Sequence, residues 1–209
     1  RKRHKAINAV LNKVLLTDSL RQKVHAGAIS INDAKGCFDR IIHTIAILVL
    51  MSYGLRQDQA RLLYDILQKA QHRIKTGFGV SDDAYGIEDP PIQGKGQGNG
   101  KSCTVWALIS SKMIETMKKN GHGVKLTSAL TLSLSIIAAF AFVDDADVPV
   151  SAPTRDTTGE EIQDSFQDAL DCWLKLLIIT GGELDPNKSW CYVIDYEWDG
   201  TKWVERSIE

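Results

Sequence analysis

The chain has 209 residues, 44% of them hydrophobic and 24% charged, with a formal net charge of −1. This length and composition are those of one ordinary globular domain with a hydrophobic core. The four cysteines and five histidines are scattered, which argues against a zinc site and favours a reducing compartment. The apolar stretches are too short or too interrupted to span a bilayer. We therefore expect an intracellular protein of the cytoplasm or nucleus, without a secretion signal.

The two parts of the sequence differ in charge. Residues 1–125 contain 20 lysines and arginines against 10 aspartates and glutamates, whereas residues 126–209 contain 5 against 16. A basic region attracts a phosphate backbone, so the pattern is compatible with nucleic-acid binding. It fits equally well a solvated surface whose two halves attract each other.

The first half of the chain is predicted to be mainly helical. An apolar run that ends in Asn32-Asp33 has the length of a short strand, and Gly54 is a natural stop between two helices. A polar loop rich in glycine and proline covers about 77–100. In order, the expected elements are a helix at 4–24, a strand at 28–31, and helices at 38–52 and 56–74.

The second half mixes helices with strands. The apolar run of residues 136–150 is broken by Asp144-Asp145, which predicts two strands joined by a tight turn. Asp199-Gly200 is a second hairpin signal. The other expected elements are helices at 101–119 and 159–179 and strands at 189–197 and 201–205. Helices combined with a small antiparallel sheet predict an α+β fold.

Asp144 and Asp145 are the first candidates for a functional site. Two adjacent carboxylates between apolar strand formers are costly to hold at a sheet edge unless a positive charge neutralises them. Divalent cations that prefer oxygen ligands are natural partners. An isolated Asp-Asp pair is more often a solvated turn. An EF-hand is excluded because Val148-Pro149 stands where that loop needs Asx-Gly.

Asp33 strengthens this hypothesis. It ends the earlier predicted strand, just before a helix. If the two strand ends lie side by side in one sheet, their carboxylates can hold two cations a few ångströms apart. Such a pair of cations activates a primer 3′-hydroxyl and stabilises the leaving pyrophosphate.

Four motifs in order resemble those of the reverse transcriptases. The run from Asp33 to Phe38-Asp39 resembles their A motif, D-x-x-x-x-[FY]-[DN], and Phe142-Val143-Asp144-Asp145 resembles their C motif, [FY]-x-D-D. The run from Gln97-Gly98 to Ser102-Cys103 resembles the B motif, Q-G-x-x-x-S-P, with cysteine in the place of proline. Residues 181–188, a glycine-rich turn that ends in lysine, resemble the D motif. A P-loop is excluded because Lys95 stands where its first glycine is needed.

The resemblance implies a two-metal site. Asp33 and Asp144 would bridge two Mg²⁺ ions, for which Mn²⁺ is a possible substitute, and Asp145 would be a supporting carboxylate. Lys188 would protonate the leaving pyrophosphate or stabilise its charge. An exposed turn lysine is an equally good interpretation of Lys188.

The resemblance also implies how substrates bind. Phe38 would lie beneath the sugar of the incoming nucleotide, where its ring would collide with a 2′-hydroxyl and so select deoxynucleotides. Gln97 and Gly98 would shape the pocket over the nascent base pair, with glycine allowing a close approach of the backbone. A core aromatic at the start of a helix is the alternative interpretation of Phe38.

The implied protein is an RNA-directed DNA polymerase of the retroelement type. Its partners would be an RNA or DNA template with a primer, and deoxynucleoside triphosphates. We expect a polymerase palm with part of the fingers: residues 1–25 as the end of the fingers and residues 26–209 as mostly palm, without the upstream fingers or the downstream thumb.

Two other functions remain possible from the sequence. One is a polymerase-like domain that binds RNA but has lost its activity. Intact Asp33, Asp144 and Asp145 argue against it. The other is an RNA-directed RNA polymerase, against which Phe38 argues, because an RNA polymerase must admit the 2′-hydroxyl.

Overall fold

The computed structural model describes residues 6–84, 94, 102–142 and 145–206. The chain forms two compact units. The first comprises Arg1–Lys35, Ser110–Ile178 and Glu183–Glu209, and the second comprises Gly36–Ile109 and Ile179–Gly182. Together they confirm the predicted α+β class.

The first unit is built on a four-stranded antiparallel sheet with the strand order β6-β7-β1-β8. β1 (Gly27–Asp33) lies between β7 (Asp145–Ser151) and β8 (Trp190–Ile194), and β6 (Phe140–Phe142) pairs with the other side of β7. Because β1 is central, most of its residues are buried. The predicted strand ending at Asp33 is thereby confirmed.

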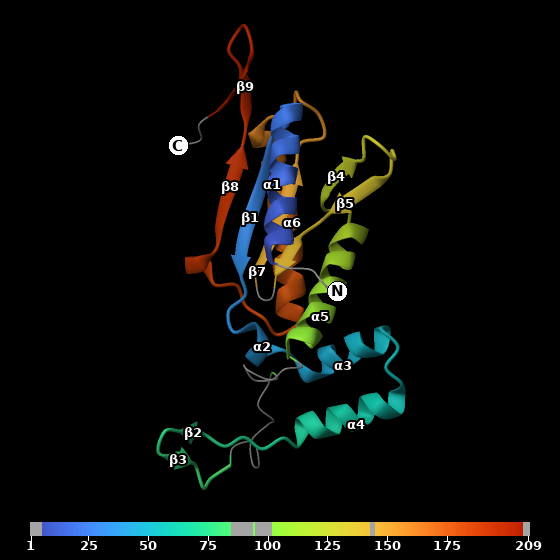
Figure 1. Ribbon diagram of the computed structural model, residues 1–209, viewed down its shortest axis with the longest axis vertical. Coiled ribbons are helices and arrows are strands. Elements are labelled where there is room, and N and C mark those ends of the chain that lie inside the picture. Colours follow the sequence, from blue (N-terminus) through green and yellow to red (C-terminus); the bar gives the residue numbers. More distant parts are fainter. Residues whose placement is uncertain (1–5, 85–93, 95–101, 143–144, 207–209) are drawn as a thin grey trace. The chain divides into compact units, whose positions relative to one another are not determined.

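Helices lie over both faces of this sheet (Figure 1). α6 (Gly159–Ile179) contributes Ile162 to a buried cluster that contains Ala28 of β1. α1 (Ala6–Lys23) lies over the opposite face, where Ile29 points, since successive side chains of a strand alternate between faces. Both helices were predicted within two residues of these bounds.

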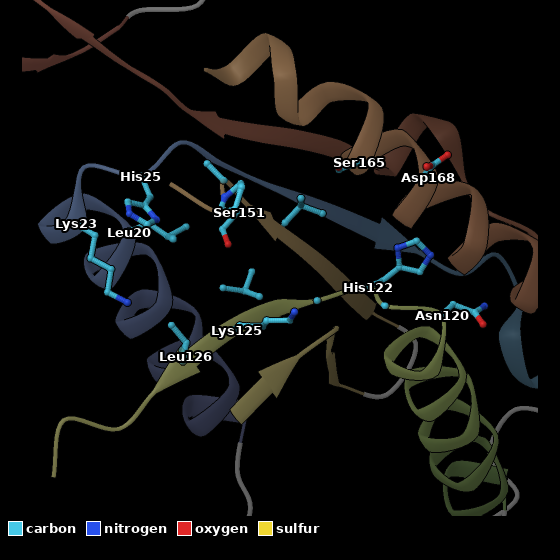
Figure 2. A pocket seen from close by; sticks show the side chains of 16 residues that line it. Leu20, Lys23, His25, Asn120, His122, Lys125, Leu126, Ser151, Ser165 and Asp168 are labelled. Carbon is cyan, nitrogen blue, oxygen red and sulfur yellow. The ribbon is translucent and has the colours of Figure 1, made fainter. Parts of the chain in front are cut away.

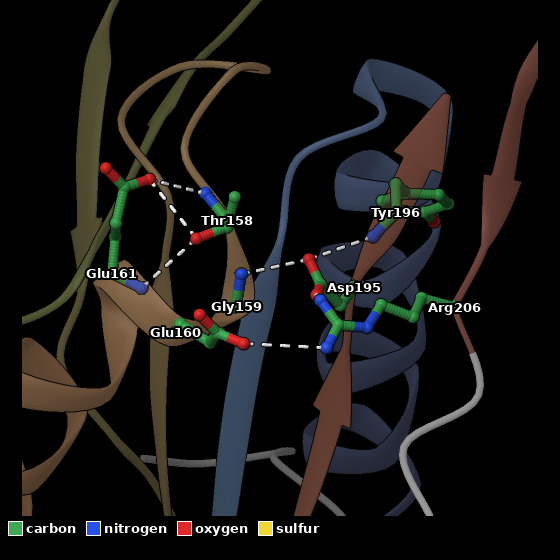
Figure 3. A network of polar contacts seen from close by, with 7 residues as sticks. All are labelled: Thr158, Gly159, Glu160, Glu161, Asp195, Tyr196 and Arg206. Atoms are coloured by element: carbon green, nitrogen blue, oxygen red, sulfur yellow. Dashed lines mark hydrogen bonds and ion pairs between the residues drawn. The ribbon is translucent and has the colours of Figure 1, made fainter. Parts of the chain in front are cut away.

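A capping box begins α6, as Figure 3 shows. The Thr158 hydroxyl accepts a hydrogen bond from the Glu161 amide at 3.3 Å, and the Glu161 carboxylate accepts one from the Thr158 amide at 2.8 Å. This reciprocal pair satisfies amide groups that the first turn of a helix otherwise leaves without partners.

Asp195 joins the start of α6 to the C-terminal strands (Figure 3). Its carboxylate accepts hydrogen bonds from the amides of Gly159 and Tyr196, each at 2.9 Å, and lies 3.6 Å from the Arg206 guanidinium. The Asp195 side chain is only 4% exposed. These contacts satisfy a carboxylate that would be costly to bury without partners.

A hairpin formed by β9 (Tyr196–Trp198) and β10 (Trp203–Glu205) follows β8. The Asp199 carboxylate accepts hydrogen bonds from the amides of Lys202 and Thr201, both at 2.8 Å. These bonds stabilise the ionised carboxylate, the Lys202 bond most, and lower the pKa of Asp199. The predicted hairpin signal at Asp199-Gly200 is confirmed.

The segment between α5 (Ser102–Lys119) and β7 differs from the prediction. β4 (Val124–Thr127) and β5 (Leu134–Ile137) form a separate hairpin, so the apolar run of residues 136–150 contributes to three strands instead of two. Gly123 lets the two backbones approach, because a Cβ there would lie 2.9 Å from the Ala138 Cα. Periodicity within one run did not reveal this partner strand.

The second unit is mainly helical, and its two predicted helices are shorter than expected. The helix predicted at 38–52 is broken at Ile41 and Ile42. The Ile41 carbonyl accepts a hydrogen bond from the Gly94 amide at 3.0 Å, and the Ile42 amide donates to the Thr180 carbonyl at 2.9 Å. These long-range bonds replace helical ones. The helix predicted at 56–74 ends at Gln68. The observed elements are α2 (Cys37–Arg40), α3 (His43–Ser52), α4 (Gln57–Gln68), β2 (Lys75–Thr76) and β3 (Gly79–Val80).

No helix within the described ranges is long and apolar enough to cross a membrane.

Gly159→Ala is expected to destabilise the first unit. The added Cβ would lie 2.9 Å from the Asp195 Cγ, and the contacts of Asp195 leave it little freedom to move. We expect a loss of about 1–3 kcal/mol in the free energy of unfolding, as in other overpacked sites. Urea denaturation measures it. The control is Gly77→Ala, whose added Cβ has no neighbour within 4 Å. Equal unfolding midpoints for the two variants would show that the close approach of Gly159 to Asp195 is not needed for stability.

Candidate active site

Two carboxylates of the predicted metal site lie opposite each other at one end of the four-stranded sheet. The register of β1 against β7 places Asp33 directly opposite Asp145. Opposed residues of an antiparallel pair have Cα atoms about 4.5–5.5 Å apart and side chains on the same face. The Asp33 side chain is 22% exposed and Asp145 is exposed. The site is therefore open to solvent on that face.

The segment with the predicted D motif, residues 181–188, is hydrogen-bonded to the end of β1. The Lys35 amide donates to the Glu183 carbonyl at 2.8 Å, and the Asp185 amide donates to the Asp33 carbonyl at 3.0 Å. The residues between them form an isolated antiparallel bridge. The backbone around Asp33 is thus held by β7 on one side and by this segment on the other.

A 3₁₀ turn, η1 (Pro186–Lys188), brings Lys188 to Asp33. The Asp185 carboxylate caps this turn by accepting a hydrogen bond from the Asn187 amide at 3.1 Å. Ser189 closes it, because its hydroxyl donates to the Asp185 carbonyl at 2.8 Å. The turn follows from its sequence, since proline suits the first helical position and aspartate is a favoured N-cap.

Lys188 is the cation nearest to Asp33 among the ion pairs of the described residues. Its Nζ lies 3.4 Å from the Asp33 Oδ2 and 3.9 Å from the Asp185 Oδ2. Its side chain is 67% exposed, and exposed ion pairs contribute at most about 1 kcal/mol. The Lys188 ammonium group therefore lies beside the Asp33 carboxylate, but this weak pair does not hold its side chain in place.

A third carboxylate on the same face was not predicted as part of the site. Asp147 follows Asp145 by two residues, so both point to the α1 side of the sheet. The Asp147 side chain is 12% exposed, and its carboxylate lies 2.6 Å from the Lys13 Nζ of α1. The alternation of Asp145 and Asp147 was visible in the sequence, but the partner Lys13 lies too far along the chain to be found from a pattern.

The remaining predicted site residues lie in the second unit or outside the described ranges. Phe38 lies in α2 of the second unit and is half-buried. No set of three His, Cys, Asp or Glu among the described residues is arranged to hold a metal ion, and that set leaves out Asp144. Three predicted residues lie outside the described ranges: Gln97, Gly98 and Asp144.

The fold is similar to that of telomerase structures. Telomerase from Candida tropicalis in complex with a TWJ fragment of telomeric RNA matches with a TM-score of 0.57 and 14% identity, over 91% of this chain and 30% of that one. The apo enzyme of that species truncated from its C-terminal domain matches with 0.57 and 13%, over 95% and 37%. Telomerase from Candida albicans with the same kind of RNA fragment matches with 0.54 and 14%, over 95% and 31%.

These similarities define the class of fold. Telomerase is a polymerase related to the reverse transcriptases, so the chain has a reverse-transcriptase-like polymerase fold. It spans about a third of the length of the telomerases that it matches. No family model and no curated protein matches the sequence.

Lys13→Met is expected to destabilise the first unit by about 2 kcal/mol, because it leaves the largely buried Asp147 carboxylate without its cation. The full loss of about 3–5 kcal/mol for a buried pair is not expected, since Lys13 is 29% exposed. Asp147→Asn in the Lys13→Met background should restore part of the stability. Urea unfolding of the two single variants and the double variant measures the coupling. If the losses in unfolding free energy of the two single variants add up to that of the double variant, the Lys13–Asp147 ion pair contributes nothing to stability.

Proposed function

We propose that the chain belongs to an RNA-directed DNA polymerase of a retroelement, which extends a primer by two-metal nucleotidyl transfer. The observation that carries the proposal is the pairing of Asp33 with Asp145, with Lys188 beside Asp33, on a reverse-transcriptase-like fold. In this proposal residues 26–209 form most of the palm and residues 1–25 the end of the fingers.

The donor chemistry of the site fits divalent magnesium. Asp33 and Asp145 offer carboxylate oxygens on one solvent-accessible face, and Mg²⁺ prefers oxygen ligands and a few carboxylates. We propose that Asp33, Asp144 and Asp145 hold two Mg²⁺ ions, with Mn²⁺ as a possible substitute. When bound, the ions would activate the primer 3′-hydroxyl and neutralise the charge of the leaving pyrophosphate.

The residues of the chain itself would position the reacting groups. The β1 backbone at Asp33 is hydrogen-bonded to the D-motif segment, so the Asp33 carboxylate projects from a fixed base, as precise positioning requires. Lys188 is exposed and only loosely paired with Asp33. Its long side chain would reach the triphosphate, where an ammonium group can donate a proton or offset negative charge.

Nucleic acid is the proposed partner. Two of the telomerase structures with this fold contain an RNA fragment, and residues 1–125 of this chain are basic. We propose that the protein binds an RNA or DNA template with a primer, and deoxynucleoside triphosphates. The retroelement type is proposed from the Gln97-Gly98-Asn99-Gly100 and Phe142-Val143-Asp144-Asp145 runs.

Asp33→Ala should lower primer extension by the full-length protein at least a hundredfold, which is about 3 kcal/mol of barrier, since Asp33 is one of the carboxylates proposed to hold the ions. The fold should survive, because the substitution removes a repelling carboxylate. The measurement is single-turnover extension on RNA and DNA templates with Mg²⁺ or Mn²⁺. Asp164→Ala, on the exposed side of α6, is the control. A variant that keeps more than a hundredth of the wild-type rate would rule out the two-metal assignment, and an inactive wild type would favour an RNA-binding domain.

Phe38→Val should keep deoxynucleotide incorporation within about tenfold of wild type, roughly 1.4 kcal/mol, while ribonucleotide incorporation rises much more. The physical reason is that a rigid ring beside the sugar excludes a 2′-hydroxyl by steric overlap. Phe38→Tyr should change little. Parallel incorporation assays with the two kinds of nucleotide measure the ratio. Equal loss of both activities would make Phe38 a packing residue, and free use of ribonucleotides by wild type would indicate an RNA polymerase.

A further inference from the structure

A cavity of about 520 Å³ lies in the first unit, away from the candidate active site. Figure 2 shows it between the end of α1, the turn after α5, β4, the end of β7, and α6. Along β7 the cavity is reached at Ser151, whereas Asp145 stands at the other end of the strand. Six residues of β-strand separate them by about 20 Å. The cavity is therefore a separate site.

Basic side chains dominate the charged lining of this cavity. Lys23 is the last residue of α1, and His25 comes two residues later. His122 lies in the turn after α5, and Lys125 lies in β4. Asp168 is the one carboxylate among the lining residues. None of the four basic side chains forms an ion pair or a side-chain hydrogen bond with any described residue. The four side chains thus bring two ammonium and two imidazole groups to one cavity, where they are available as hydrogen-bond donors to a ligand.

The two histidines reach the cavity through the same kind of helix ending. At the end of α1 the Val24 amide donates to the Arg21 carbonyl at 3.1 Å and the His25 amide donates to the Leu20 carbonyl at 3.0 Å. These are the bonds of a Schellman motif, whose pivotal residue is left-handed. Val24 has a φ of 56°, a conformation that costs a β-branched residue free energy.

The end of α5 repeats this geometry with a glycine. The Gly121 amide donates to the Lys118 carbonyl at 3.1 Å, and the His122 amide donates to the Met117 carbonyl at 3.0 Å. Gly121 has a φ of 89°. In both helices the residue immediately after the left-handed position is a histidine that lines the cavity. The backbone hydrogen bonds at the two helix ends therefore fix the Cα positions of His25 and His122.

Helix ends alone do not explain the charges. A lysine near a helix C-terminus is favoured by the helix dipole, which accounts for Lys23. Lys125 lies in β4, where no such dipole acts, yet Figure 2 shows its side chain extending along the cavity. A zinc-type site is also not supported, because no His, Cys, Asp or Glu group in the described part of the chain is arranged for a metal.

We propose that this cavity binds a nucleotide through its phosphate, either as a free nucleotide or as one unit of a single-stranded nucleic acid. Ammonium and imidazole groups are donors suited to phosphate oxygens. A volume of about 520 Å³ lies within the range of about 300–1,000 Å³ typical of small-molecule sites, so the cavity holds more than a phosphate ion. Asn120, Ser151 and Ser165 add polar groups for the sugar or base.

NMR titration of the chain tests this site directly, with the imidazole and backbone resonances of His25 and His122 as the readout. The probes are inorganic phosphate, AMP, and a short single-stranded oligonucleotide. We expect both histidines to shift with one saturation curve for AMP or for the oligonucleotide, and inorganic phosphate to bind more weakly. Shifts with AMP indicate a free nucleotide, and shifts with the oligonucleotide alone indicate a nucleic-acid strand.

Variants with matched charge complete the test. Lys23→Gln with Lys125→Gln should weaken the affinity at least about tenfold, because both charge-assisted contacts are lost. Lys118→Gln with Lys202→Gln removes the same charge from exposed positions outside the cavity and should change the affinity less than twofold. Asp33→Ala should bind as wild type does, since the active site is elsewhere. The proposal is overturned if the histidines do not shift, if both lysine pairs weaken binding equally, or if inorganic phosphate binds as tightly as the nucleotide probes.

Discussion

The register of β1 against β7 is the constraint on which the proposed site depends. Because side chains alternate along a strand, a slip of one residue would turn Asp33 to the α6 face and separate it from Asp145. The pairing is secured on both edges of β1, by β7 and by β8. It is secured again beyond the strand end by the Asp185 amide on the Asp33 carbonyl. The D-motif segment thus holds the site in register and also carries Lys188.

This register also gathers negative charge. Asp33, Asp145 and Asp147 share one face of the sheet, and like charges at this spacing repel one another. The protein offsets the deeper carboxylate with Lys13 at 2.6 Å and the outer one with the exposed Lys188 at 3.4 Å. Because the Asp147 carboxylate is largely buried, removing its partner Lys13 is expected to be costly. The looser pair leaves Asp33 accessible to a metal ion, which the proposed chemistry requires.

How much the sequence could predict depended on the distance between interacting residues. The start of α6 at Thr158 and the end of α5 near Gly121 follow from local capping patterns, and their helices were predicted well. The break at Ile41–Ile42 results from hydrogen bonds to Gly94 and Thr180, which no local pattern contains. Lys13 was missed for the same reason, and so was β4, the partner of β5. Asp33 and Asp145 became candidates because each lies at the end of a predicted strand, and the four ordered motifs then linked these distant positions, which periodicity alone cannot do.

Metal binding at the end of β1 is the central claim, and paramagnetic NMR tests it most directly. Substoichiometric Mn²⁺ should broaden the backbone resonances of Asp33 and Asp145 before those of other residues, and excess Mg²⁺ should reverse the effect by competition. Asp33→Asn should abolish the selective broadening, while Asp164→Asn should leave it intact. Broadening that is spread over the acidic surface, or that survives in Asp33→Asn, would contradict the account.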